Sequence, residues 1–316
     1  MTTAAIEVAG LTKRFGETRA IDGIDLRVEE GEAFGFLGPN GAGKTTTIRA
    51  ILGLLKPTSG RTSVHGHDSW SKPVEVHRLV GTLPGNFRYD DTLTGRQLLL
   101  HVARLRGASA DDIAHGEQLA DRLHADLTRP LGDLSRGNHQ KIGLVQAMFH
   151  RPKVLLLDEP TSGLDPLMQD LFIDLVHEAR DGGATVFLSS HNLTEVERTC
   201  RRVAIIRGGK VVTTDEVSEL ADRALRHVRV AFDDDVPRGE LEQLPGATDL
   251  AIRGKQATFR IAGELDALTA LLSRHHVHDL VVEHASLDEL FRSFYENESE
   301  PAAVSATPGG EARTDA

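Results

Sequence analysis

Apolar and polar residues alternate in two short stretches near the start of the chain. In Ile6–Val8 and again in Ile24–Val28, every second residue is apolar. Because successive side chains of a strand point to opposite faces, this alternation predicts two edge-like antiparallel strands. We therefore expect a β-rich N-terminal layer.

A second pattern consists of short, largely apolar runs, namely Ala33–Leu37, Val154–Leu157 and Thr185–Ser189. Such runs are typical of strands in a parallel sheet whose two faces are covered by helices. Val203–Ile206 and Lys210–Thr213, joined by a glycine-containing turn, predict a terminal hairpin.

Apolar residues spaced by three and four positions predict helices between these runs. One helix is expected from Gly43 to Leu54, and others between Thr92 and Pro130, where LLLHVARL and EQLADRL show this spacing. The pattern predicts an α/β domain over residues 1–219, with a mixed sheet, N-terminal antiparallel strands and a helical subdomain over about residues 92–150.

The composition changes after about Glu219. Val228–Phe232, Ala257–Ile261 and Leu280–Glu283 predict strands, and Leu265–Leu272 predicts a helix. These elements indicate a small α+β domain over residues 220–296. Glu, Pro, Ala, Gly and Thr dominate residues 297–316, which are expected to be a disordered tail.

Charge, cysteine content and hydropathy argue against a nucleic-acid-binding, disulfide-bonded or membrane-spanning protein. The net charge of −11 disfavours general attraction to nucleic acid, so no nucleic-acid partner is expected. The only cysteine is Cys200, which excludes an internal disulfide and suits a reducing cytosol. The start of the chain shows no secretory signal, and its apolar runs are far shorter than the ~20 residues of a membrane span. Work at a membrane would therefore require another chain to span it.

The segment GPNGAGKT fits the pattern of a phosphate-binding loop between a strand and a helix. Its glycines let backbone N–H groups approach a β-phosphate, and the helix N-terminus adds a favourable dipole. Lys44 would contact the β- and γ-oxygens, Thr45 would offer a hydroxyl to Mg²⁺, and Thr46 would donate near the α-phosphate. A plain glycine-rich turn is the alternative, which the complete motif disfavours. The residues expected to bind the phosphates of a nucleotide are Gly38, Pro39, Asn40, Gly41, Ala42, Gly43, Lys44, Thr45 and Thr46.

Two adjacent carboxylates follow the apolar run Val154–Leu157. Asp158 lies where a carboxylate reaches Mg²⁺ through its water shell, so Thr45 and Asp158 are the predicted metal-binding residues. Glu159 is the candidate to orient or deprotonate an attacking water. A solvated acidic turn is the alternative, and the preceding apolar residues together with Pro160 disfavour it.

Taken together, these motifs resemble the ATP-binding subunit of an ABC transporter, over roughly residues 6–219. LSRGN, Leu134–Asn138, is similar to the family signature LSGGQ, and SGLD, Ser162–Asp165, is similar to its D-loop. His191 matches the family's switch histidine, although a single histidine is by itself more often structural. Phe15 matches the aromatic residue that the family stacks on adenine, where a phenyl ring gives little base selectivity.

The resemblance implies a head-to-tail dimer that encloses ATP. Ser135 and the Gly137 amide of one copy would face the γ-phosphate held by Lys44 of the other. His191 would bond the same phosphate and hold Glu159 and a water in line. Because one chain carries every part, a homodimer would have two competent sites.

Two sites depart from the family pattern. Where the family has Gln or Glu after the strand that here reads VGTLP, this chain has Gly85 and then Asn86. Either Asn86 or a water replaces the missing ligand, with water favoured, or coupling runs through the loop backbone. In the signature, Arg136 and Asn138 replace Gly and Gln. Arg136 either adds a cation near the partner's phosphates or lies on the surface.

The C-terminal region carries a weaker resemblance. Ala285–Tyr295, ASLDELFRSFY, is similar to the closing helix of the accessory domain in exporter subunits of the daunorubicin-resistance type. Four histidines nearby could indicate a metal site, but without cysteine or a clear helical pair a solvated or core role is favoured; they are His275, His276, His278 and His284.

The expected function is that of an ATP-hydrolysing exporter subunit, peripheral on the cytoplasmic face of the plasma membrane, which dimerises on ATP and drives a separately encoded polytopic permease. Drug or antibiotic efflux follows only from the C-terminal resemblance. A soluble ABC-type ATPase is the main alternative, disfavoured by the single cassette, the absence of heptads and the negative charge. An importer subunit is another, although its extra domain would more often be a longer β-rich barrel. Intact Glu159 and His191 argue against a non-catalytic protein.

Overall fold

The computed structural model describes residues 4–85, 89–223, 226–263 and 265–284, which belong to two compact units, Met1–Arg223 and Ala224–Ala316. An antiparallel sheet opens the first unit. Its strands, in the order β2-β1-β4-β5, are β1 (Ala4–Phe15), β2 (Thr18–Glu29), β4 (Ser59–Val64) and β5 (His67–Asp68). The two predicted antiparallel strands are confirmed, but of the two only β2 is an edge strand, since β1 pairs with both β2 and β4. Both strands are longer than the alternating stretches of sequence. Register shifts in their pairing interrupt the alternation of apolar and polar residues, so the sequence pattern covers only part of each strand.

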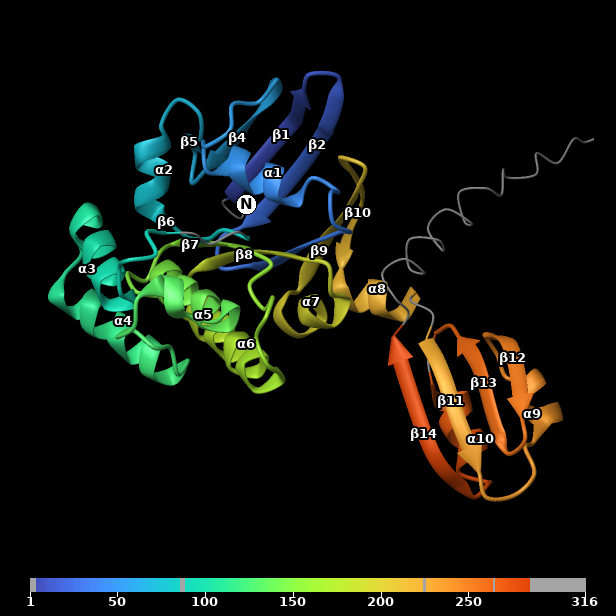
Figure 1. Cartoon of the computed structure of the whole chain (residues 1–316). Coiled ribbons are helices and arrows are strands. Elements are labelled where there is room, and N and C mark those ends of the chain that lie inside the picture. The colour runs from blue at the N-terminus through green and yellow to red at the C-terminus, as the bar shows by residue number, and fades with distance from the viewer. Residues whose placement is uncertain (1–3, 86–88, 224–225, 264, 285–316) are drawn as a thin grey trace, which may run out of the picture. The chain divides into compact units, whose positions relative to one another are not determined.

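A six-stranded sheet forms the centre of this unit (Figure 1). Its order is β10-β9-β3-β8-β7-β6, and all neighbouring strands are parallel except β10 and β9. The strands are β3 (Ala33–Leu37), β6 (Val80–Leu83), β7 (Val154–Asp158), β8 (Thr185–Ser190), β9 (Arg202–Arg207) and β10 (Lys210–Glu216). Every residue of β3, β7 and β8 is buried, which explains their continuous apolar runs.

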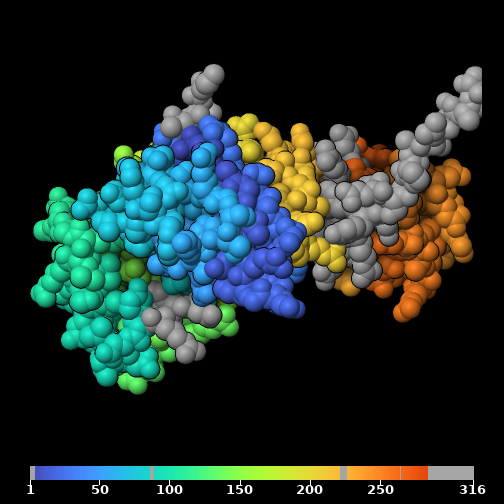
Figure 2. All heavy atoms as spheres, turned by 90° about the horizontal axis from the view of Figure 1, so that it is seen from above, coloured from blue at the N-terminus to red at the C-terminus, as the bar shows by residue number. Residues whose placement is uncertain are grey.

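Different layers cover the two faces of this central sheet. Helix α1 (Lys44–Ile51) and the antiparallel sheet share one apolar core with it. In Figure 1, α5 (Arg136–Met148), α6 (Pro166–Asp181) and α7 (Leu193–Thr199) lie on the other side. Helices therefore cover one face as predicted, whereas a sheet contributes to the other. Figure 2 shows β1, β2, β4 and α2 (Pro73–Leu79) as one continuous face in blue to cyan.

The predicted helical region contains α3 (Gly95–Arg106) and α4 (Ala110–Arg122), which pack with α5. Thr94 and Ser109 each begin a helix with a reciprocal capping box. A short 3₁₀ turn, Leu131–Asp133, precedes α5. Arg106 donates to the carbonyls of His77 and Val80, at 3.0 and 2.9 Å, and so joins the end of α3 to the end of α2 and the start of β6.

After α8 (Val217–Arg223), the second unit has the element order β-α-β-β-α-β, a split βαβ arrangement. Its elements are β11 (Arg226–Phe232), α9 (Arg238–Glu242), β12 (Ala247–Arg253), β13 (Gln256–Ile261), α10 (Asp266–Leu272) and β14 (Val277–His284). The sheet order β12-β13-β11-β14 is antiparallel throughout. The three predicted strands and the helix are confirmed; β12 and α9 were not predicted.

Some predictions fall outside the described residues, namely Asn86, the segment Ala285–Tyr295 and the tail 297–316. Within the described ranges, no helix combines the length and apolarity that a bilayer crossing needs. In the same ranges, no three histidine, cysteine or acidic residues gather as a metal site. Two of the clustered histidines instead face acids, since His275 lies 3.1 Å from Glu240 and His278 lies 3.4 Å from Asp233.

Candidate active site

The phosphate-loop motif follows the buried strand β3 directly and leads into α1. Gly43, the residue before the helix, has φ +114°, and a Cβ there would lie 2.8 Å from the Ala20 carbonyl oxygen. Only glycine suits this position. Along the loop, Asn40, Gly41 and Thr45 are exposed, Pro39 and Thr46 are half-buried, and Gly38, Ala42, Gly43 and Lys44 are buried. The motif is thus a tight turn whose exposed tip adjoins a helix N-terminus.

Lys44 lies under this turn and is only 5% exposed. Its Nζ donates to the carbonyls of Gly38, at 2.5 Å, and Pro39, at 3.2 Å. The same Nζ lies 3.1 Å from Oε1 of Glu159. The lysine therefore joins the loop after β3 to the acidic end of β7, although β8 lies between these two strands in the sheet.

Asp158, the last residue of β7, is 1% exposed and accepts two side-chain hydrogen bonds. Thr45 Oγ1 donates to its Oδ2 at 2.6 Å, and Ser189 Oγ donates to its Oδ1. A charge buried this deeply requires such partners. The two residues predicted to bind Mg²⁺ are thus brought into direct contact.

Glu159 has an unusual backbone conformation, with φ +51°. Its amide donates to the Ser189 carbonyl at 3.0 Å, which ties the turn to β8. Its carboxylate lies between two basic groups, because Oε1 faces Lys44 and Oε2 lies 2.6 Å from Nδ1 of His191. A left-handed, non-glycine residue at this point costs free energy and is characteristic of functional sites.

The side chains of Lys44, Thr45, Asp158 and Glu159 together form what we call the lysine–carboxylate group. Gly85 lies against the Asp158 side chain of this group. A Cβ on Gly85 would be 2.9 Å from Oδ2 and 3.2 Å from Cγ of Asp158. The position therefore adjoins the predicted metal ligand, but the glycine offers only its backbone.

The signature turn, Ser135–Asn138, makes its hydrogen bonds away from the phosphate loop. Ser135 caps α5 by accepting from the Asn138 amide at 3.3 Å, and Asn138 Oδ1 accepts from the Asp126 amide at 3.2 Å. Arg136, placed in the sequence either near a partner's phosphates or on the surface, is exposed and donates to Ser162 Oγ at 2.7 Å. Among the described residues, no hydrogen bond links Ser135–Asn138 to the phosphate loop of the same chain.

Two further predicted residues are also separate from the lysine–carboxylate group. Asp165 caps α6 by accepting from the Met168 amide at 3.1 Å. Phe15 ends β1, and its ring is 52% exposed with Lys13 Nζ 5.0 Å from the centroid. An exposed ring of this kind can stack on a planar ligand.

Three polar residues around the site were not predicted. Ser189 holds Asp158, as described above. Gln140 on α5 is 8% exposed and donates to the carbonyls of Glu159 and Pro160. Glu195 on α7 is 6% exposed and accepts from Ser190 Oγ at 2.5 Å, and burial raises the pKa of its carboxyl. In the sequence, only their nearness to the signature and to His191 indicates a role. Serine, glutamine and glutamate are common residues, and none of the three belongs to a recognisable motif.

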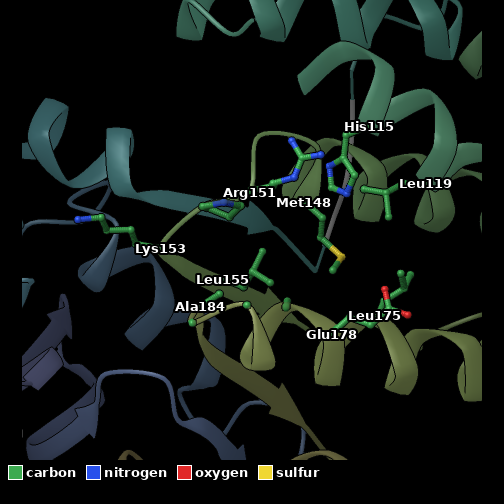
Figure 3. A pocket seen from close by; sticks show the side chains of 13 residues that line it. His115, Leu119, Met148, Arg151, Lys153, Leu155, Leu175, Glu178 and Ala184 are labelled. Carbon is green, nitrogen blue, oxygen red and sulfur yellow. The ribbon is translucent and has the colours of Figure 1, made fainter. Parts of the chain in front are cut away.

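A separate hollow of about 380 Å³ lies at the opposite, amino-terminal ends of β7 and β8. Figure 3 shows His115, Leu119, Met148 and Leu175 turned toward it from α4, α5 and α6. Its rim carries charges of both signs, and the residues of the phosphate loop are not part of its lining. It is therefore distinct from the lysine–carboxylate group.

Comparison with known proteins agrees with the geometry. Residues 21–162 match the ABC transporter family model. Over 306 residues, the chain is 35% identical to the daunorubicin/doxorubicin resistance ATP-binding protein DrrA of Streptomyces peucetius, covering 92% of each chain. The chain belongs to the ABC transporter ATP-binding proteins. This places the lysine–carboxylate group in a known family of nucleotide-binding subunits.

Other ABC transporter proteins show the same relationship. The bacitracin transport ATP-binding protein BcrA of Bacillus licheniformis is 34% identical, over 72% of this chain and 75% of its own. A solved ATP-binding subunit of an ABC transporter superimposes with a TM-score of 0.62 at 29% identity, covering 68% of this chain and 91% of its own. The predicted ABC ATPase fold is confirmed.

Proposed function

We propose that this chain binds and hydrolyses ATP, as a dimer of two copies, to drive a separate permease in an exporter. The observation that carries the proposal is the convergence of Lys44, Thr45, Asp158 and Glu159 at the carboxyl ends of the central strands. Family membership supports ATP as the nucleotide, and the names of the relatives, which include drug resistance and bacitracin transport, support export.

The group is suited to Mg²⁺ as well as to phosphate. Thr45 and Asp158 offer a hydroxyl and a carboxylate in contact with each other, and oxygen donors of this kind suit Mg²⁺ together with substrate phosphates and water. When bound there, Mg²⁺ would neutralise charge on the phosphate oxygens. These two residues would hold it.

The protein's own residues would perform the remaining steps. Phosphate oxygens would compete with the Gly38 and Pro39 carbonyls and with Glu159 for Lys44 Nζ. Glu159, released from the lysine, would accept a proton from the attacking water, and His191 would hold that carboxylate from its other oxygen. Phe15 would stack on the base.

The signature turn supports the dimer. Ser135 and the Gly137 amide lie at the N-terminus of a thirteen-residue helix, a favourable site for an anion. In the part of the chain that the structure describes, they make no hydrogen bond to their own phosphate loop. We infer that they contact the γ-phosphate held by the partner copy. Residues 1–219 would form the ATPase domain, peripheral on the cytoplasmic face of the membrane, and residues 220–296 an accessory domain.

The test is Glu159→Gln in the purified full-length chain. ATP turnover should fall by about 10²- to 10⁴-fold, because the variant lacks a general base. ATP binding should persist, and ATP should hold the variant as a dimer in size-exclusion chromatography. Glu178→Gln is the control, since Glu178 is exposed and pairs with Arg122 away from the site. Turnover at the wild-type rate in Glu159→Gln would disprove the role of this carboxylate.

A further inference from the structure

Gln140 is buried on α5 at a place where its amide reaches the turn after β7. Its Nε2 donates to the Pro160 carbonyl at 2.7 Å and to the Glu159 carbonyl at 3.1 Å. The residue is 8% exposed, and an amide buried without partners would cost about 1–3 kcal/mol. Both donor hydrogens are therefore directed at two consecutive carbonyls of the turn.

These carbonyls belong to a strained part of the backbone. Glu159 has φ +51°, which is unfavourable for a residue with a side chain. The Glu159 carbonyl also accepts from the Ser162 amide at 3.2 Å, while its own amide donates to Ser189 at 3.0 Å. The direction of the Glu159 carboxylate follows from this backbone, so a change in the turn would move the carboxylate away from Lys44 and His191.

We propose that Gln140 is a positioning residue for Glu159, which it holds in the left-handed conformation through the two carbonyls. This inference rests on the proposed ATPase function. It has a structural consequence, because Gln140 lies on the same helix that begins at the signature turn. Arg136 adds a third hydrogen bond from this helix to the turn, by donating to Ser162 Oγ. The helix that would contact the partner's nucleotide is thus fastened to the candidate water-activating carboxylate of its own chain.

The test uses Gln140→Glu, which keeps the size of the side chain but replaces the donor with a carboxylate facing two carbonyls. Gln146→Glu is the matched control. Gln146 lies on the same helix and is also 8% exposed, but its Oε1 accepts from Tyr89 Oη at 2.7 Å, a bond that a carboxylate can keep. Both variants bury one carboxylate, so any general loss of stability is shared.

We expect kcat of Gln140→Glu to be about 10- to 100-fold below that of Gln146→Glu, because a small misplacement of a catalytic group has effects of this size. The KM for ATP should stay within about twofold, since the phosphate loop is untouched. The deficit should shrink as pH falls, because the introduced carboxyl group, once protonated, can again donate one hydrogen bond.

Equal kcat values for the two variants, or a deficit that does not change with pH, would overturn the role of Gln140. If Gln140→Glu does not fold, kcat of Gln140→Met is compared with that of Gln146→Met, and the same 10- to 100-fold difference is expected. A wild-type chain without ATPase activity would instead refute the proposed function, so the two failures are distinguishable.

Discussion

The interiors of the two units differ in their polar content. Within the described residues, all buried polar and charged side chains belong to Met1–Arg223, including Lys44, Gln140, Asp158 and Glu195. The described core of the second unit is apolar, built around residues such as Val230 and Phe259. Burying a polar group costs free energy unless it finds partners. The first unit thus buries polar side chains, several of them at the candidate active site, whereas the described core of the second unit is formed by apolar side chains.

The largest effect that tests this contrast is expected from Phe259→Ala. Phe259 is 3% exposed in the apolar core of the second unit, and removing a buried phenyl ring costs about 3–5 kcal/mol. Calorimetry of the full-length protein should show the second unit unfolding at a lower temperature, while the ATPase rate stays within about twofold. Thr258→Ala, an exposed neighbour on the opposite face, should cost less than about 0.5 kcal/mol. A parallel loss of ATPase activity in Phe259→Ala would contradict the separation of roles.

A smaller effect is expected from Gly85→Ala. The new Cβ would lie 2.9 Å from Oδ2 of Asp158, and that carboxylate cannot move freely because Thr45 and Ser189 hold it. Overpacking of this size costs about 1–3 kcal/mol, and the same cost on the transition state corresponds to a roughly 5- to 150-fold loss of ATP turnover. Gly239→Ala, which meets open space in the second unit, is the control. Unchanged turnover in Gly85→Ala would show that Asp158 tolerates displacement.

The smallest effect concerns the pH dependence of stability. Burial raises the pKa of Glu195 above its usual 4.5, so the folded state favours the neutral carboxyl. Ionisation therefore destabilises the fold increasingly as pH rises from about 4.5 through the folded pKa. In Glu195→Gln, the unfolding temperature should exceed that of the wild type at neutral pH, and the difference should vanish in acid.

Glu178→Gln should show the opposite sign, which makes it a control for Glu195→Gln. The hydrogen bond from Arg122 lowers the pKa of Glu178, so its stabilising effect is present above pH 4.5 and is lost as pH falls through the lowered pKa. A difference between Glu195→Gln and wild type that is constant across pH would mean that Glu195 does not titrate as inferred.

The buried strands and the phosphate-binding loop could be predicted because their signals are local. Val154–Leu157 is continuously apolar, and GPNGAGKT places its chemistry within eight consecutive residues. Strand β12 and helix α9 of the second unit were missed for a physical reason. Strand β12 is largely exposed and α9 has five residues, so neither shows a clear apolar period.

The polar residues that support the candidate site could not be predicted in the same way. Gln140 lies 19 residues before Glu159, and Ser189 lies 31 residues after Asp158. Their roles depend on α5 and β8 meeting the end of β7, a tertiary arrangement that no spacing along the chain encodes. The sequence identified the groups expected to touch the nucleotide, and the structure identified the groups that hold them.

The only cysteine of the chain bears on how the molecule can be labelled. Cys200 follows α7, is 7% exposed, and burial raises the pKa of its thiol to about 12. It is therefore protonated at neutral pH and shielded from alkylating reagents. A cysteine introduced at a surface position such as Leu105, which is 75% exposed, would be the single reactive thiol of each copy. The natural sequence thus already serves as a background for fluorescent probes that would test the proposed dimer.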